Sequence, residues 1–379
     1  MKVAIIHDWL VEYGGGERAL SALIACFPGA DVFATVDFLP AEHRHILRGA
    51  RVSPSAVQRM PWARTRHQYY LPVMPLCMEQ LDLAGYDLIV SNSHAVAKGV
   101  TVHPEQVHVS YVLSPMRFAW DLQASYLRDM HLDGGIRGLA ARLLLHRLRV
   151  WDVTTAARVD AMAVPSRYIA RRVELCYRRT AVIIPPPVDV DFFTPGAADV
   201  EDFYLTASRL IPFKRTAAIV QAFSTLPARR LVVIGDGPDL ARLRAMATPN
   251  VTFTGYQSAD VLRDHMRRAR AFLFAAPEDF GIVMVEAQAC GTPVIAVACG
   301  GALDIVRSID HAHPTGLLVH DSAPLSIAEG VRLFERDGGR ITAANCRANS
   351  LRFRPERFAA EFAAFAEEAL ARYGTWSAR

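Results

Sequence analysis

Two glutamates eight residues apart, Glu278 and Glu286, mark the segment of this sequence best suited to chemistry. Between them lies the loop Phe280-Gly281-Ile282-Val283, and a short helix is predicted to begin near its end and to stop at Gly291. Carboxylates accept hydrogen bonds from the vicinal hydroxyls of a ribose or a hexose, and backbone N–H groups at the start of a helix bind phosphate. The segment therefore predicts a site for an extended ligand that carries both sugar and phosphate.

Two basic residues, Arg209 and Lys214, follow the apolar run 203–207, which predicts a buried strand. Ligands of open α/β sheets bind just beyond the carboxyl ends of the strands. Lys214 is one of only three lysines among 42 basic residues. A compact ammonium there suits a diphosphate leaving group, and the planar guanidinium of Arg209 would bind the same oxygens. Ordinary surface charge is the alternative interpretation.

A second glycine-rich segment, Gly14-Gly15-Gly16, opens a predicted helix that runs to about Phe27. Glycines at a helix start allow phosphate to approach backbone N–H groups. The segment also satisfies G-x-G-x-x-A with Asp37 about 20 residues further on, so a dinucleotide-binding dehydrogenase is an alternative. Several residues separate the preceding strand from the first glycine, however, and this spacing does not allow the tight turn of that fingerprint.

The elements that position these segments alternate between short buried strands and longer helices. The pattern predicts two doubly wound parallel sheets with a ligand cleft between the two domains, and the proline triplet 185–187 marks the linker. The predicted strands are 3–6, 32–36, 88–90, 107–112 and 161–164 in the first domain, and 203–207, 231–234, 251–253, 271–274 and 294–297 in the second.

Two helical segments carry apolar residues at helical spacing. The last segment, 355–379, is predicted to pack back on the protein. The segment 137–150 places arginines among leucines, which suits either an ordinary surface helix or docking at a membrane interface. Residues 1–187 carry 21 Lys and Arg against 16 Asp and Glu, whereas the remainder carries 21 against 22. The basic first half indicates contact with anionic lipid or a phosphorylated substrate, or solvated arginines alone.

Composition excludes several classes of protein. With 379 residues, 51% of them hydrophobic, the chain is too long for a small stapled fold and too apolar for global disorder. Six widely spaced cysteines argue against a zinc ribbon or a disulfide framework. The N-terminus lacks a signal-peptide core and no apolar run reaches about 18 residues, so we expect a cytoplasmic protein, peripheral to the membrane. Asp189-Val190-Asp191 follows the linker instead of a nucleotide-binding strand, and we expect no metal there.

These motifs together resemble the retaining GT-B glycosyltransferases of family 4. The resemblance rests on Glu278 to Glu286, the stretch 208–215, Gly235-Asp236-Gly237-Pro238 and the N-terminal glycine loop. The stretches 7–10, 91–100 and 115–121 resemble bacterial O-antigen and exopolysaccharide mannosyltransferases in particular. The resemblance covers nearly the whole chain.

This resemblance implies a GT-B fold of two Rossmann-like domains that face each other across a cleft. Residues 1–187 would form the acceptor-binding domain, with a helix of about 356–379 packing back on it, and residues 188–355 the donor-binding domain. Arg209 and Lys214 would hold the diphosphate, Glu286 the ribose and Glu278 the sugar. The remaining donor contacts would come from Gly235, Gly237, Phe280, Gly281, Ile282 and Val283, and Gly14, Gly15 and Gly16 would position the acceptor.

One position departs from the family pattern. Relatives often place a histidine where this chain has Leu113, and that histidine contacts the donor sugar. Leucine offers neither a hydrogen bond nor a proton. Either His94 substitutes from the neighbouring loop, or donor preference or activity is altered. His94 is therefore a candidate site residue, with a structural role as the alternative. Arg117, which belongs to the stretch 115–121, is a further candidate.

The function implied is transfer of a hexose, mannose from GDP-mannose, to a lipid-linked saccharide in surface polysaccharide synthesis. The enzyme would act at the inner face of the cytoplasmic membrane, retain the anomeric configuration and require no metal or other cofactor besides its nucleotide-sugar donor. We expect no nucleic-acid partner, because no stretch combines dense basic charge with stacking aromatics. Alternatives are a UDP-sugar transferase or a sugar-nucleotide epimerase on the same fold, and a non-catalytic sugar-nucleotide-binding subunit.

Overall fold

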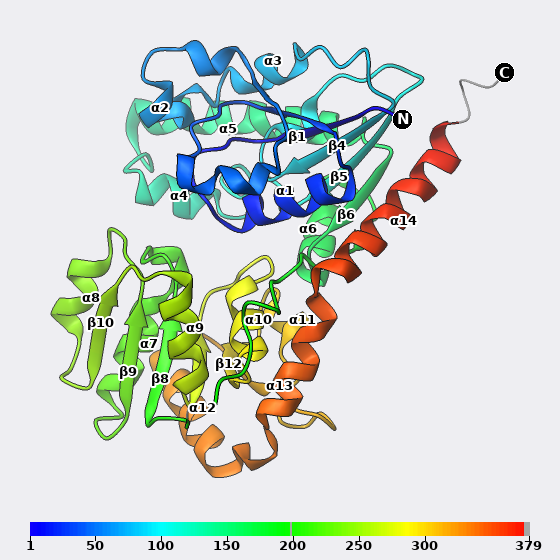
Figure 1. Cartoon of the computed structure of the whole chain (residues 1–379). Coiled ribbons are helices and arrows are strands. Elements are labelled where there is room, and N and C mark those ends of the chain that lie inside the picture. Colours follow the sequence, from blue (N-terminus) through cyan, green and yellow to red (C-terminus); the bar gives the residue numbers. More distant parts are fainter. Residues whose placement is uncertain (198, 375–379) are drawn as a thin grey trace. The chain divides into compact units, whose positions relative to one another are not determined.

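The computed structural model describes residues 1–197 and 199–374 and divides into two compact units. The first unit comprises Met1–Pro187 together with Phe358–Arg379, and the second comprises Val188–Arg357. Each unit is built around its own parallel β-sheet with helices on both faces (Figure 1). The proline triplet predicted as the linker ends the first segment of the first unit.

The first unit contains a seven-stranded sheet in the order β3-β2-β1-β4-β5-β6-β7, with every pair parallel. Its strands are β1 (Val3–His7), β2 (Asp31–Ala34), β3 (Val52–Pro54), β4 (Leu88–Ser93), β5 (Val107–Val112), β6 (Ala161–Val164) and β7 (Val182–Ile183). The strand order reverses between β1 and β4. In such sheets the carboxyl ends at the reversal form the ligand-binding edge.

The second unit repeats this plan with six parallel strands in the order β10-β9-β8-β11-β12-β13. They are β8 (Phe203–Ala207), β9 (Arg230–Ile234), β10 (Val251–Gly255), β11 (Ala271–Phe274), β12 (Val294–Val297) and β13 (Gly316–Val319). Here the order reverses between β8 and β11. The two doubly wound sheets predicted from the sequence are confirmed.

The strand predictions missed three edge strands and extended one strand too far. Both residues of β7 are exposed and β3 has only three residues, so neither forms the buried apolar run on which the prediction depended. The four-residue β13 begins at a glycine and was also missed. The predicted strand 32–36 ends two residues early, at Ala34, and the Thr35 N–H donates to the Asp8 carbonyl at 3.0 Å.

Helices connect the strands in both units. The first unit contains α1 (Gly15–Cys26), α2 (Ala63–Arg66), α3 (Met74–Glu79), α4 (Gln123–Asp129), α5 (Gly135–Ala156), α6 (Arg167–Tyr177) and most of α14 (Pro355–Tyr373). The second contains α7 (Thr216–Ser224), α8 (Leu240–Met246), α9 (Ala259–Arg268), α10 (Ile282–Ala289), α11 (Ala302–Ile305), α12 (Pro324–Asp337) and α13 (Ala343–Ser350).

The C-terminal helix α14 completes the core of the first unit. Phe358 and Phe362 are fully buried, and their rings lie 5.6 and 6.0 Å from the ring of Tyr111 on β5. This is the amphipathic helix predicted for the end of the chain. Residues 375–379 of the predicted segment lie outside the described residues.

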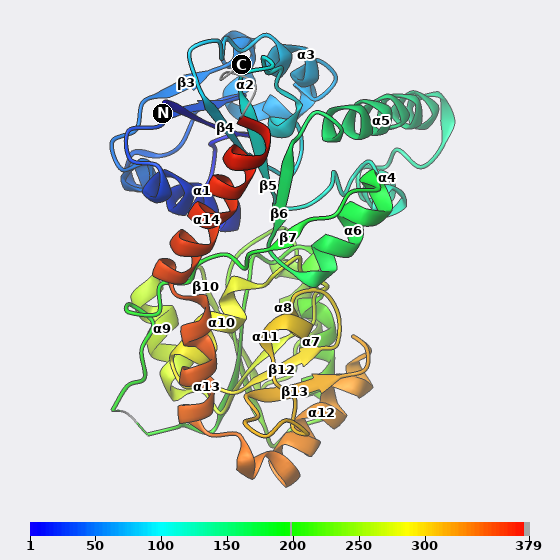
Figure 2. The same ribbon diagram turned by 90° about the vertical axis from the view of Figure 1, so that its right-hand side faces the viewer.

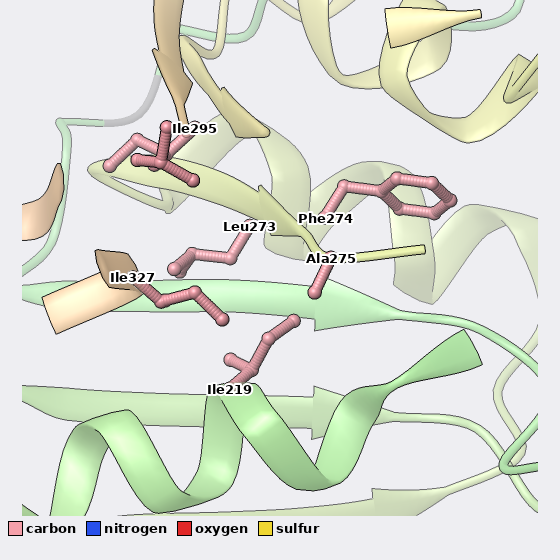
Figure 3. Close-up of a pocket in the computed structure, with 7 residues that line it drawn as sticks. Ile219, Leu273, Phe274, Ala275, Ile295 and Ile327 are labelled. Carbon is pink, nitrogen blue, oxygen red and sulfur yellow. The ribbon is translucent and has the colours of Figure 1, made fainter. Parts of the chain in front are cut away.

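A small apolar gap lies in the core of the second unit, between one face of the sheet and two helices. Figure 3 shows Leu273 and Ala275 pointing toward Ile219 of α7 and Ile327 of α12, while Phe274 points to the opposite side of β11. The gap is too narrow to admit a water molecule. It is therefore part of the core and no ligand site.

Candidate functional site

Lys214 and Glu278 form an ion pair at the strand reversal of the second sheet. Lys214 ends a short 3-10 helix (Pro212–Lys214) that follows β8, and Glu278 lies in the loop that follows β11. The Lys214 Nζ and the Glu278 Oε1 are in direct contact, and the side chains remain 23% and 15% exposed. Because β8 and β11 are neighbours, their parallel direction brings two residues 64 positions apart to one edge. The structure thus joins two of the residues predicted to bind the donor.

Two predicted glycines allow the segment after β8 to pass close to the segment after β9. Gly235 and Gly237 have φ of +137° and +153°, and a Cβ atom on either would overlap the carbonyl oxygen of Ser208 or Leu210, respectively. The Leu210 N–H donates to the Asp236 carbonyl at 2.8 Å. These glycines therefore fix the backbone on which Arg209 and Lys214 are carried.

Replacing Gly235 with alanine should lower the free energy of unfolding of the second unit by about 2–4 kcal/mol, because it adds an overlap with Ser208 to an unfavourable φ. Gly255→Ala is the matched control, since Gly255 has φ +73° but open space around its Cβ position. That variant should lose only about 1–2 kcal/mol. Denaturant unfolding measures both. Equal losses of unfolding free energy in the two variants would show that the close approach of Gly235 to Ser208 does not affect stability.

A second pair of glycines, which the sequence analysis did not single out, supports the loop that carries Glu278. A Cβ atom on Gly300 would overlap the carbonyl oxygen of Glu278, and one on Gly301 would overlap that of Phe280. The Gly301 N–H donates to the Glu278 carbonyl at 2.9 Å. The adjacent pair Gly300-Gly301 after β12 was the available signal, since paired glycines often mark a close backbone approach.

The start of α10 has the geometry expected of a phosphate-binding turn. Gly281 precedes the helix with φ +95°, and Ile282 and Val283 form its first turn, where N–H groups lack intrahelical partners. The helix begins one residue earlier than predicted. The Phe280 ring is buried and lies 5.5 Å from the ring of Phe353, so the side chain of Phe280 belongs to the core of the second unit.

Arg209 and Glu286 differ in exposure. Arg209 is exposed beyond the end of β8, whereas Glu286 lies in α10 with only 3% of its surface exposed. A carboxylate buried to this extent is costly unless it is hydrogen-bonded. Glu286 is therefore the more enclosed of the two glutamates predicted to bind the donor. Its effect on binding is best tested with glutamine, which preserves its volume.

The first unit contains a buried carboxylate at the equivalent strand reversal. Asp8 follows β1, and its two oxygens accept hydrogen bonds from four consecutive backbone N–H groups after β4, at 2.6 to 3.0 Å. The donors are His94, Ala95, Val96 and Ala97. The Asp8 side chain is fully buried. The sequence analysis gave Asp8 no role, although an aspartate directly after a buried strand was a visible signal.

His94 completes this arrangement through its side chain. Its Nδ1 lies 2.9 Å from Asp8 Oδ2, and the Trp9 ring packs edge-on at 4.7 Å. Burial alone would lower the pKa of His94, but the charge and hydrogen bond of Asp8 outweigh burial and raise it. Arg117, the other candidate of this region, lies close enough to oppose that increase in pKa by its charge. With its side chain 32% exposed, His94 presents a polarised imidazole at the edge of the sheet.

The glycine loop Gly14-Gly15-Gly16 is held by a second carboxylate. Glu17 Oε2 accepts from the Gly14 N–H at 2.9 Å, and Glu17 Oε1 lies 3.3 Å from Nε2 of the buried His7. Burial would raise the pKa of Glu17, but the His7 hydrogen bond and charge lower it. Asn92 Nδ2 donates to the Gly16 carbonyl at 2.9 Å. The first glycine N–H is therefore engaged by the chain itself.

Leu113 lies against this loop. A Cβ atom on Gly16 would lie 3.4 Å from the Cδ1 of Leu113. Leu113 thus packs beside the glycines. His94, whose imidazole is polarised by Asp8, follows β4, and Leu113 follows the neighbouring strand β5.

A buried ion pair holds residues 94–98, the segment whose N–H groups surround the Asp8 carboxylate. Lys98 Nζ contacts Asp152 Oδ1 of α5, and both side chains are at most 1% exposed. The other Asp152 oxygen accepts from Trp120 Nε1 at 2.8 Å and from the Tyr177 hydroxyl at 2.9 Å. Both charges are satisfied, so the pair fixes the position of residues 94–98 relative to α5.

The carboxylates of two short motifs are hydrogen-bonded within the chain. Asp37, the candidate ribose ligand of a dehydrogenase, accepts two hydrogen bonds from Arg44, each of 3.0 Å. Asp189 Oδ1 accepts from the Phe192 N–H at 2.9 Å. Within the described residues, no three His, Cys, Asp or Glu side chains are grouped so as to hold a metal ion. All six cysteines, each within the described ranges, are free thiols.

Two doubly wound parallel sheets in separate units, with charged residues at the strand reversal of each, define the GT-B class of protein. The family model described as "Glycosyl transferases group 1" matches residues 188–352. A D-inositol 3-phosphate glycosyltransferase from Kineococcus radiotolerans is 35% identical over 352 residues, which cover 79% of each chain. The chain belongs to the group 1 glycosyltransferase family.

Further relatives agree with this assignment. A GDP-mannose-dependent alpha-(1-6)-phosphatidylinositol monomannoside mannosyltransferase from Mycobacterium tuberculosis is 32% identical over 212 residues. That alignment covers 47% of this chain, and the chain spans about half of the relative's length, 54%. Among solved structures, a sucrose-phosphate synthase from Thermosynechococcus elongatus superposes with a TM-score of 0.73, and Anabaena HepE in complex with UDP and glucose with 0.70.

These superpositions cover 98% and 97% of this chain and 100% and 99% of the others. At 18% and 20% identity they establish the fold alone.

Proposed function

We propose that this protein is a retaining, metal-independent hexosyltransferase of family 4. It transfers mannose from GDP-mannose to a lipid-linked saccharide at the inner face of the cytoplasmic membrane, in the assembly of a surface polysaccharide such as O-antigen or exopolysaccharide. The observation that carries the proposal is the Lys214–Glu278 pair at the strand reversal of the second sheet. The pair places an ammonium at the edge where ligands of open α/β sheets bind.

The chemistry follows from the charges. When the bond between the anomeric carbon and the diphosphate breaks, its electron pair leaves with the nucleoside diphosphate, and the sugar becomes oxocarbenium-like. The acceptor hydroxyl oxygen bonds to the anomeric carbon on the face that the diphosphate leaves, and the hydroxyl proton passes to an oxygen of the departing diphosphate. Lys214 and Arg209 stabilise the negative charge that develops on the leaving oxygens. Glu278 holds the Lys214 ammonium in position before the donor binds, so little reorganisation accompanies the reaction. The N–H groups at the start of α10 bind the phosphates.

The donor and the acceptor are inferred from relatives. The name of the M. tuberculosis relative specifies GDP-mannose as its donor and a phosphatidylinositol monomannoside, a lipid-linked saccharide, as its acceptor. The O-antigen or exopolysaccharide role rests on resemblance of the stretches 7–10, 91–100 and 115–121. The described residues contain no helix that is long and apolar enough to span a bilayer. In the proposal the protein reaches its acceptor from the membrane surface.

Calorimetric binding of GDP, UDP and NAD to the purified protein tests the donor assignment. We expect GDP to bind more tightly than UDP, with no binding of NAD. Glu286→Gln should weaken GDP binding by about 10- to 100-fold, because it removes the charged acceptor of a ribose hydroxyl. Glu329→Gln is the matched control, since Glu329 is exposed on α12 and forms an ion pair with Arg332 of the same helix.

Each other outcome has a defined meaning. A preference for UDP would retain the family and overturn the assignment of mannose and its donor. Absence of any nucleotide binding would favour a non-catalytic subunit. With a GDP-mannose substrate, the proton-carbon coupling at the anomeric position of the product tests retention. Undiminished turnover in excess chelator is expected of a metal-independent enzyme.

A further inference from the structure

The long helix α5 has an apolar stripe on the side that faces away from its own unit. Figure 2 shows α5 running along the outside of the first unit, near α4. Five large apolar residues of α5 lie at positions i, i+3, i+7, i+14 and i+17, which fall on one face of a helix. They are Ile136, Leu139, Leu143, Val150 and Val153, and they are 88%, 59%, 58%, 56% and 39% exposed. We call this stripe the α5 outer face.

The opposite side of α5 fixes the orientation of the helix. Leu148, Asp152 and Thr155 are buried against the unit, and Asp152 is bound by Lys98, Trp120 and Tyr177. Rotation of α5 would break this buried network. The outer face is therefore presented to solvent by the fold itself, whereas a solvated surface helix usually carries polar residues there.

The charges around the outer face are almost all positive. Arg142 and Arg147 flank the stripe on its two sides, and His146 lies between them, all three exposed. The only acidic residue within α5 is Asp152, which is buried and paired with Lys98. Asp129 and Asp133 precede the helix, before its first turn. An exposed apolar stripe between arginines is typical of helices that lie in the interface of an anionic bilayer.

We propose that the α5 outer face docks this protein on the surface of an anionic membrane. The proposal deepens the proposed function and rests on it, because a lipid-linked acceptor places the reaction at a membrane. The leucines of the α5 outer face enter the boundary between headgroups and acyl chains, and Arg142 and Arg147 bind lipid phosphates. A second copy of the chain is the less favourable occupant, since pairing two outer faces would bring the same arginines together without counter-charges.

Sedimentation with lipid vesicles tests the proposal on the full-length protein. We expect binding to vesicles of phosphatidylglycerol and phosphatidylcholine, weaker binding to pure phosphatidylcholine, and a decrease as salt concentration rises. Leu139→Gln combined with Leu143→Gln should lower the partition coefficient roughly tenfold or more. Arg142→Gln combined with Arg147→Gln should lower it by roughly tenfold or more, and only on the anionic vesicles.

The helix α6 of the same unit provides matched controls. Leu175 is 49% exposed there, and Arg171 pairs with Glu174. Leu175→Gln and Arg171→Gln should bind vesicles as the wild type does. Absence of wild-type binding, or unchanged binding of the α5 variants, would overturn the proposal. So would a wild-type dimer that the leucine variant converts to a monomer in analytical ultracentrifugation.

Calorimetry with GDP on the same samples separates the two proposals. The α5 variants should bind GDP as the wild type does, because the substituted residues lie in the first unit and the proposed donor site in the second. Vesicle binding without GDP binding would overturn the donor assignment and leave the docking surface intact. GDP binding without vesicle binding would overturn the docking surface and leave the donor assignment intact.

Discussion

Replacing Lys214 with alanine should lower kcat by roughly 100- to 1000-fold, the usual cost of removing a preorganised electrostatic donor from a developing charge. The ammonium is held by Glu278, a residue of the same unit. GDP binding should weaken less than turnover, because charge on the leaving oxygens is greatest in the transition state. Steady-state kinetics and GDP calorimetry on one preparation measure both effects.

Three further variants define what the loss means. Lys214→Arg keeps the charge and should recover part of kcat, although the planar guanidinium fits the site differently. Arg230→Ala removes a charge at the opposite, amino-terminal end of the sheet and should leave kcat unchanged. Glu278→Gln removes the carboxylate charge that pairs with the Lys214 ammonium. An unchanged kcat in Lys214→Ala would remove Lys214 from the mechanism.

Asp8→Asn should lower the free energy of unfolding of the first unit by about 3–5 kcal/mol. The buried Asp8 carboxylate accepts hydrogen bonds from four backbone N–H groups and contacts the His94 imidazole. An asparagine amide has one acceptor oxygen in place of two charged oxygens, so some of these donors would lose their partner. Hydrogen exchange should also accelerate at the amides of residues 94–97. Asp82→Asn is the matched control, because Asp82 is exposed and accepts a hydrogen bond from the Ala84 N–H at 3.1 Å. Losing the Asp82 charge should cost under about 1 kcal/mol.

The pH dependence of this stabilisation follows from the two pKa shifts. Burial would raise the pKa of Asp8, but the charge and hydrogen bonds of His94 lower it below its ordinary value of 3.8, so its contribution is lost as pH falls through the lowered pKa. The pKa of His94 is raised from 6.5, so its contribution is complete below that value and is lost as pH rises through the raised pKa.

The difference between wild type and Asp8→Asn should therefore be largest between about pH 4 and 6.5. NMR titration of His94 provides a second measurement. Its pKa should fall in Asp8→Asn, because the variant loses the charge and hydrogen bond of Asp8 that outweigh burial, while the smaller influences of Glu17 and Arg117 oppose each other. An unaltered His94 titration would contradict the assigned coupling.

The sequence by itself determined the fold class, because buried parallel strands are short apolar runs that local composition displays. The predicted strands 107–112, 161–164, 203–207, 271–274 and 294–297 agree residue for residue with the structure. The glycine-rich turns were visible for a similar reason, since glycine marks the places where the backbone needs a positive φ or a close approach. The short exposed edge strands β3 and β7 carried no such signal.

The partnerships of the charged residues were decided only by the tertiary structure. Lys214 and Glu278 are 64 residues apart, Asp8 and His94 are 86 apart, and Lys98 and Asp152 are 54 apart. Strand order brings them together, and strand order depends on how the whole sheet packs instead of on local pattern. The same holds for α5, whose sequence shows that it is amphipathic but leaves open which side is buried. The Lys98–Asp152 pair decides that, because a buried charge must face its partner.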